Sequence, residues 1–98
     1  MKLTKSLKDN ILTVAVEGRL DTSTSPELDE LLTAERDNAD KLVLDFSGLD
    51  YISSAGLRVL LSNHKAMASK GGMTVTGVSP IVAEIFEITG FSDILNIE

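Results

Sequence analysis

The chain has 98 residues, no cysteine and a net charge of −6, which comes from 15 acidic and 9 basic residues. This length is typical of a single domain with its own hydrophobic core, so we expect one domain over residues 1–98. The lack of cysteine excludes disulfides, thiolate catalysis and cysteine zinc sites, and the negative charge disfavours nucleic acid and anionic membranes as partners. A protein partner is therefore expected.

The N-terminal sequence MKLTKSLKDN has no apolar stretch of the kind found in signal peptides. No window of the sequence approaches the roughly 20 apolar residues of a membrane-spanning helix. We therefore expect a soluble, cytoplasmic protein that does not insert into a membrane.

The first segments of the chain have the pattern of a β-hairpin. Residues 3–7 and 11–16 both contain apolar residues, and the turn-forming Lys8, Asp9 and Asn10 separate them. The second segment has apolar residues at every second position, so one of its faces should be buried. Gly18 is expected to end this strand.

A polar passage rich in Ser and Thr follows and predicts the start of a helix. Its N-cap stays open between two residues. Ser25 as the cap would put Pro26 at the first helical position. Thr24 as the cap would instead pair with Glu27 in a capping box. In either case the helix should run to about Asp37 and bury three leucines: Leu28, Leu31 and Leu32.

Residues 41–71 are the centre of the expected fold, with the pattern strand, loop and helix. The strand is predicted over Lys41–Asp45, and its unbroken apolar run is typical of a strand covered on both faces. Ser53 is the natural N-cap of the helix, which should end at Gly71 and Gly72. Apolar residues at helical spacing predict its buried face: Leu57, Leu60, Leu61, Met67 and Ala68.

The C-terminal part of the chain predicts a further strand over Met73–Thr76 and a third helix from Ser79 and Pro80 to Gly90. Residues 91–97 should form a last strand or a short helix. The order β β α β α β α β predicts an α/β domain in which helices flank a mixed sheet. Apolar residues cover much of one side of the third helix: Ile81, Val82, Ile85, Phe86 and Ile88.

Catalytic groups are scarce in this sequence. His64 is the only histidine, and we expect it at the edge of a buried helix face with its ring hydrogen-bonded. Residues 48–56 contain glycines but lack the spacing and the lysine of a nucleotide phosphate loop. Asp21, Asp45 and Asp50 can converge at one end of the sheet. Asp residues at strand ends and helix starts usually stabilise turns and are not usually catalytic. We therefore expect no enzyme activity, no metal and no cofactor.

The start of the central helix is the best place in the chain for an anion. Its first turn presents N–H groups without intrahelical partners and the positive end of the helix dipole. The small residues Ser53, Ser54 and Ala55 leave that backbone accessible, so a ligand carboxylate or a phosphate on either serine would be stabilised. The alternative is that the serines only cap the helix.

Three segments together resemble the STAS domain of bacterial anti-sigma factor antagonists over essentially the full chain: GRLDTSTSPELDELL, LVLDFSGLDYISSAGLRVLL and GGMTVTGVSPIVAEIFEITGF. The resemblance implies a small mixed sheet flanked by helices. It also implies partner switching, in which the unmodified protein binds an anti-sigma factor kinase and frees the sigma factor. Phosphorylation of a Ser or Thr at the start of the central helix abolishes binding, and a serine/threonine phosphatase restores it.

The sequence departs from this family at the switch itself. The family's phosphorylated hydroxyl commonly lies directly before the loop glycine, and here that residue is Ala55. Phosphorylation would therefore move to Ser54, with Ser53 as second choice, or be lost. The resemblance implies a partner-binding surface made of Asp21, Asp50, Ser53, Ser54, Ala55 and Gly56. We expect Arg58, on the exposed side of the helix, to belong to the same surface, because the neighbouring loop is polar, accessible and held by rigid elements on both sides.

Ala55 leaves a second interpretation open. In this alternative the chain is a STAS subunit or ligand-sensing module that works without phosphorylation in a larger signalling or transport assembly. In both cases we expect a monomer or a weak dimer.

Overall fold

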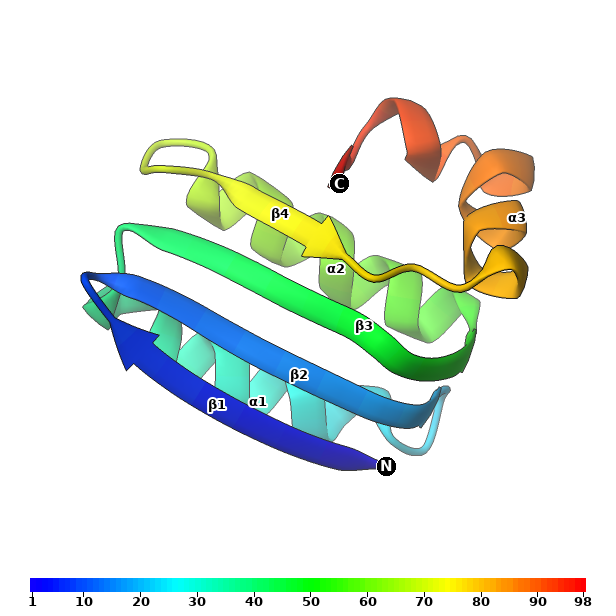
Figure 1. The fold of residues 1–98 in the computed structure, drawn as a ribbon, viewed down its shortest axis with the longest axis horizontal. Coiled ribbons are helices and arrows are strands. Elements are labelled where there is room, and N and C mark those ends of the chain that lie inside the picture. Colours follow the sequence, from blue (N-terminus) through cyan, green and yellow to red (C-terminus); the bar gives the residue numbers. More distant parts are fainter.

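The structure is a computed structural model that describes residues 1–98 as five strands and three α-helices (Figure 1). The strands form one mixed sheet in the order β1-β2-β3-β4-β5, in which only β1 and β2 are antiparallel. The strands are β1 (Lys2–Lys8), β2 (Ile11–Leu20), β3 (Lys41–Ile52), β4 (Met73–Thr76) and β5 (Asn96–Ile97). The expected α/β order is confirmed.

Each parallel connection contains a helix. The α-helices are α1 (Ser25–Glu35), α2 (Ser54–Met67) and α3 (Pro80–Thr89). Short 3₁₀ helices follow α1 and α3, at Arg36–Asn38 and Phe91–Asp93. The last residues thus contain both of the elements that the sequence left open, a helical turn and then a short strand.

The turn between β1 and β2 consists of two residues. Asp9 and Asn10 have φ values of 54° and 63°, the backbone of a type I′ turn, and Lys8 pairs directly with Ile11. Asp and Asn tolerate positive φ better than other non-glycine residues. The predicted hairpin is confirmed, with Lys8 belonging to the strand and not to the turn.

Helices cover one face of the sheet, and the other face is only partly covered. α1 and α2 pack against each other behind the sheet in Figure 1, and the residues of β2 and β3 that point toward them are buried. Val43 and Asp45 point the other way and are half-buried. The expectation that this strand is covered on both faces is wrong, because α1 and α2 lie on the same side. The buried residues of β2 and β3 are Leu12, Val14, Val16, Leu20, Leu42, Leu44, Phe46, Leu49 and Ile52.

Two strands are longer than the sequence pattern predicted. β2 continues past Gly18 to Leu20, and β3 includes residues 46–52, which were expected to form a loop. Gly18 has a φ of 100°, and the pairing register of the two strands shifts on either side of it. Such irregularities bend a strand without ending its pairing. As a result β2 and β3 end side by side, with Leu20 opposite Ile52.

α2 ends four residues before the predicted glycine pair. The backbone N–H groups of Lys70 and Gly72 both donate to the carbonyl oxygen of Met67, at 3.0 Å each. Gly72 has a φ of 89°, which a residue with a side chain rarely adopts. The two glycines therefore form the turn between α2 and β4.

The buried face of α2 includes a polar residue that the sequence did not predict. Leu57, Leu60 and Met67 are buried as expected, whereas Leu61 is half-buried and Ala68 is exposed. Asn63 is fully buried, where its amide donates to the carbonyl of Val59 at 2.8 Å and accepts from the guanidinium of Arg36 at 2.9 Å. These two hydrogen bonds pair the polar atoms of the Asn63 side chain, so its burial carries little free-energy cost.

Neither cap proposed for α1 acts as one. Thr24 occupies the N-cap position, but its hydroxyl donates to the carbonyl of Arg19 at 2.8 Å, and no side chain caps the helix. α3 begins as predicted, because the Ser79 hydroxyl accepts from the N–H of Val82 at 3.3 Å, and it ends at Gly90. The predicted cap of α1 is wrong because the Thr24 hydroxyl forms hydrogen bonds within the preceding loop instead.

We expect Leu60→Ala to lower the free energy of unfolding by about 2 to 5 kcal/mol, because it leaves a cavity where a fully buried side chain was. Leu61→Ala is the matched control on the same helix. Since Leu61 is half-buried, its truncation should cost clearly less. Urea denaturation followed by circular dichroism measures both, and equal losses would show that the buried face of α2 is assigned wrongly.

Candidate functional site

The loops after β2 and β3 meet at one edge of the sheet. Because the two strands are parallel, both end at this edge, and α1 and α2 begin there. The backbone N–H of Ser53 donates to the carbonyl of Leu20 at 2.8 Å. The start of α2 is thereby fixed against the end of β2.

Gly56 allows α2 to come this close. A Cβ atom at this position would lie 2.8 Å from Cγ1 of Ile52 and 2.9 Å from Cγ of Leu20, both of which are core side chains. Carbon atoms do not approach so closely without displacement. Gly56 is itself buried, so it serves the site by fixing the position of its neighbours.

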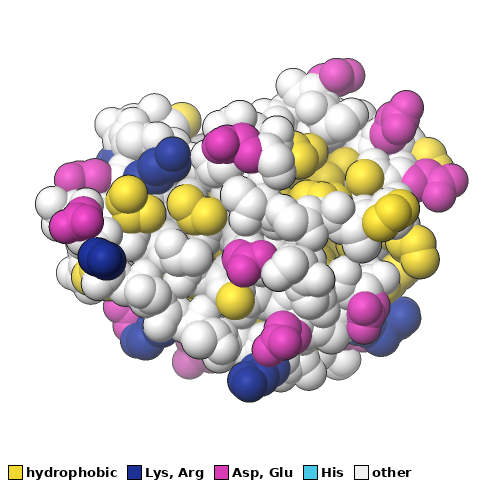
Figure 2. All heavy atoms as spheres, viewed as in Figure 1, with side chains coloured by type: hydrophobic (Ala, Val, Ile, Leu, Met, Phe, Trp, Pro, Cys, Tyr) yellow, Lys and Arg dark blue, Asp and Glu magenta, His cyan; other side chains and the backbone are white.

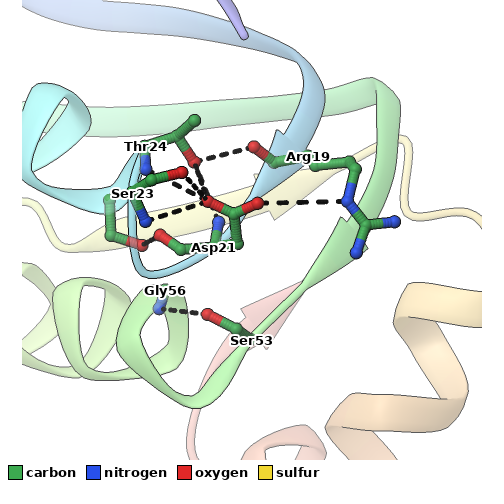
Figure 3. A network of polar contacts seen from close by, with 7 residues as sticks. Arg19, Asp21, Ser23, Thr24, Ser53 and Gly56 are labelled. Atoms are coloured by element: carbon green, nitrogen blue, oxygen red, sulfur yellow. Dashed lines mark hydrogen bonds and ion pairs between the residues drawn. The ribbon is translucent and has the colours of Figure 1, made fainter.

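Ser53 caps α2 as the sequence predicted. Its hydroxyl oxygen accepts from the N–H of Gly56 at 3.4 Å (Figure 3). Ser54 is the first residue of the helix and is exposed, whereas Ala55 is half-buried. Of the two serines, only Ser54 therefore has both an exposed position and no role in the cap.

The carboxylate of Asp21 organises the loop between β2 and α1. Its Oδ1 accepts from the hydroxyl of Ser23 at 2.8 Å, from the N–H of Ser23 at 3.0 Å and from the N–H of Thr24 at 3.1 Å (Figure 3). The hydrogen bond from the Ser23 side chain, together with those from Thr24, holds the pKa of Asp21 below its usual value of 3.8. Asp21 is thus a charged residue that shapes the loop next to the start of α2.

Arg19 connects this loop to β3. Its guanidinium carbon lies 4.4 Å from the ring centroid of Tyr51, and its Nε lies 3.9 Å from Oδ2 of Asp21. Arg19 and Tyr51 are partners in the parallel register. The sequence pattern did not indicate this pair, because both strands were predicted to end too early. Strands of the observed length place the two residues side by side.

A shallow hollow of about 310 Å³ lies between the starts of α1 and α2. Ala55 and Arg58 line it together with residues of α1 that were not predicted to belong to the site. Asp50 is exposed on β3 and does not line the hollow. The lining residues are Thr22, Ser25, Pro26, Asp29, Ala55, Arg58, Val59 and Ser62.

Other chemistry near this edge is limited. No three His, Asp or Glu side chains come together where they could hold a metal ion. His64 is half-buried as expected, but its Nδ1 is buried without a hydrogen-bond partner, so the expectation of a hydrogen-bonded ring is wrong for that atom. None of the helices has the length and apolar character needed to cross a bilayer.

The family model for the STAS domain matches residues 2–98. The chain belongs to the STAS domain family. This STAS domain is 38% identical to BtrV of Bordetella bronchiseptica, a protein named as an anti-sigma factor antagonist, over 96% of this chain and 83% of that protein. It is 30% identical to the anti-sigma-B factor antagonist of Staphylococcus aureus, over 99% of this chain and 92% of that protein.

The fold of the STAS domain is also similar to solved structures. The crystal structure of an anti-sigma factor antagonist from Mycobacterium paratuberculosis matches with a TM-score of 0.88 and 24% identity, over 98% of this chain and 83% of that one. The resemblance drawn from the three sequence segments is therefore confirmed for both family and fold.

Proposed function

We propose that this STAS domain is an anti-sigma factor antagonist that acts by partner switching in bacterial transcription or stress signalling. In its unmodified form it binds an anti-sigma factor that is also a serine kinase, and the sigma factor is released. The names of relatives at 38% and 30% identity support this role. The structural observation that carries it is the exposed start of α2, fixed between the ends of two paired strands.

The proposed partner surface consists of Asp21, Asp50, Ser53, Ser54, Ala55, Gly56 and Arg58. Its rigidity supports the proposal, because a surface that is already ordered loses little conformational entropy on binding. Rigidity comes from the Ser53 cap, the close packing of Gly56 and the hydrogen bonds of Asp21. Arg58 and Asp21 add charges of opposite sign, which can fix the orientation of a partner.

This role requires no catalysis by the STAS domain itself. The kinase activity belongs to the anti-sigma factor, and a serine/threonine phosphatase reverses the modification. The domain works in the cytoplasm, where sigma factors meet RNA polymerase. It acts as a monomer or weak dimer.

Ser54 is the proposed phosphorylation site, with Ser53 as second choice. Ser54 is exposed at the helix start, whereas the hydroxyl of Ser53 is engaged with Gly56. A phosphate at Ser54 adds about −1.5 to −2 charges, which the N-terminus of α2 partly compensates. Folding should survive this change, but a partner would have to desolvate the new charge or supply a cation for it.

A second function is favoured by Ala55 and by the hollow beside it. A methyl group cannot accept a phosphate, and the hollow of about 310 Å³ has room for a small ligand. In this alternative the domain is a ligand-sensing or structural subunit of a larger signalling or transport assembly and is never phosphorylated. The two functions differ in whether a kinase modifies the chain.

We expect Arg58→Glu to weaken binding to the anti-sigma factor, because it reverses an exposed charge on the proposed surface. Lys65→Glu is the matched control, since Lys65 is exposed on the last turn of the same helix. Isothermal titration calorimetry measures affinity, and circular dichroism verifies the fold. Equal affinities for both variants and the unaltered protein would remove this face from the proposal.

Incubation with the cognate anti-sigma kinase and ATP should place one phosphate on Ser54, which peptide mass spectrometry locates. Ser54→Ala should abolish the modification, while Ser53→Ala should retain it. A phosphate on Ser53 alone would reverse our order of choice. Modification of neither serine would favour the alternative without phosphorylation.

A further inference from the structure

α3 carries apolar side chains on two sides. Val82 and Phe86 point inward and are fully buried. Ile81 and Ile88, two helical turns apart, are 59% and 77% exposed, the highest values among the large hydrophobic residues of the chain. Ile85 lies between them on the same helical face and is half-buried. The sequence pattern placed all five apolar residues on one side of the helix, and in the structure only Val82 and Phe86 of these are fully buried.

We name Ile81, Ile85 and Ile88 the outer stripe of α3. The burial of Val82 and Phe86 already holds α3 on the domain. The exposed side chains of the outer stripe therefore do not stabilise the fold. Single exposed hydrophobic residues are normal on a protein surface, but a row of three on one helical face is typical of an interface. Their spacing of four and then three residues is the spacing by which one helix packs along another.

The charged residues near the outer stripe indicate which kind of partner it can bind. Residues 71–98 contain four acidic residues and no Lys, Arg or His. All four are exposed, and Glu84 lies on α3 one turn from both Ile81 and Ile88. Figure 2 shows hydrophobic side chains gathered at the end of the molecule where α3 lies, with acidic side chains beside them and one basic side chain below them. The four acidic residues are Glu84, Glu87, Asp93 and Glu98.

This acidic surround disfavours two of the possible occupants. A second copy of the chain would bring two sets of carboxylates together, which is unfavourable at an interface that buries them. An anionic membrane surface would be repelled for the same reason. A basic amphipathic helix fits, because its apolar stripe covers the isoleucines while flanking Lys or Arg residues face the carboxylates.

From this arrangement we infer that α3 is a second docking surface of the domain, and that its occupant is a basic amphipathic helix of a protein partner. The surface is built from α3 and is separate in sequence from the residues at the start of α2. It does not depend on phosphorylation.

The test uses the full chain and a fluorescent synthetic peptide of Leu and Lys designed as an amphipathic helix, with a Leu and Glu peptide of the same pattern as control. Fluorescence anisotropy should show binding of the Lys peptide only. Ile81→Ser combined with Ile88→Ser should weaken it on the order of tenfold or more, since two largely exposed side chains lose their burial. Leu7→Ser combined with Ile11→Ser, at the hairpin, should leave affinity unchanged.

Four results would overturn the inference. The Lys peptide could bind the double isoleucine variant as tightly as the unaltered chain, or the Glu peptide could bind equally well. Analytical ultracentrifugation could show a dimer that the isoleucine variant abolishes, which would make a second copy the occupant. Flotation with phosphatidylcholine vesicles could show binding that depends on the stripe, which would assign it to a lipid surface. Matching unfolding curves for all variants verify that the substitutions leave the fold intact.

Discussion

The start of α2 packs directly against the ends of β2 and β3, and this close contact determines how the loops at this end of the sheet are arranged. It requires a residue without a side chain at Gly56, because any Cβ there would displace Leu20 and Ile52 from the core. The hydrogen bond from Ser53 to Leu20 holds the backbone in the same place. Three residues at the helix start are thereby presented on a backbone that has little freedom to move, and this is what a reusable binding surface needs.

The topology of the sheet explains why polar residues gather around this contact. Parallel strands end at one edge, so the loop shaped by Asp21 and the start of α2 become neighbours although about thirty positions separate them in the chain. α1 and α2 cover the same face and bound a shallow hollow between their N-terminal halves. The sheet thus supplies the stability, while the loops and helix starts form the proposed partner surface.

The sequence predicted the features that depend on neighbours along the chain. The hairpin turn at Asp9 and Asn10, and the caps at Ser53 and Ser79, follow from local hydrogen bonding and backbone preference. The extension of β3 through residues 46–52 was missed because pairing with β2, and not local preference, holds that segment extended. The cap of α1 failed because the Thr24 hydroxyl had a partner at Arg19. Asn63 is buried because its side-chain oxygen accepts a hydrogen bond from Arg36. The spacing of apolar residues along one helix cannot indicate such a contact with a distant residue.

The proposed docking surface for the anti-sigma factor is the start of α2. Hydrogen–deuterium exchange of the unmodified domain, alone and in complex with its cognate anti-sigma factor, tests it most directly. We predict slower amide exchange on binding in residues 53–58 and in the adjoining loop at residues 21–25, with the hairpin of β1 and β2 unchanged. A stable complex in which neither segment gains protection would contradict it.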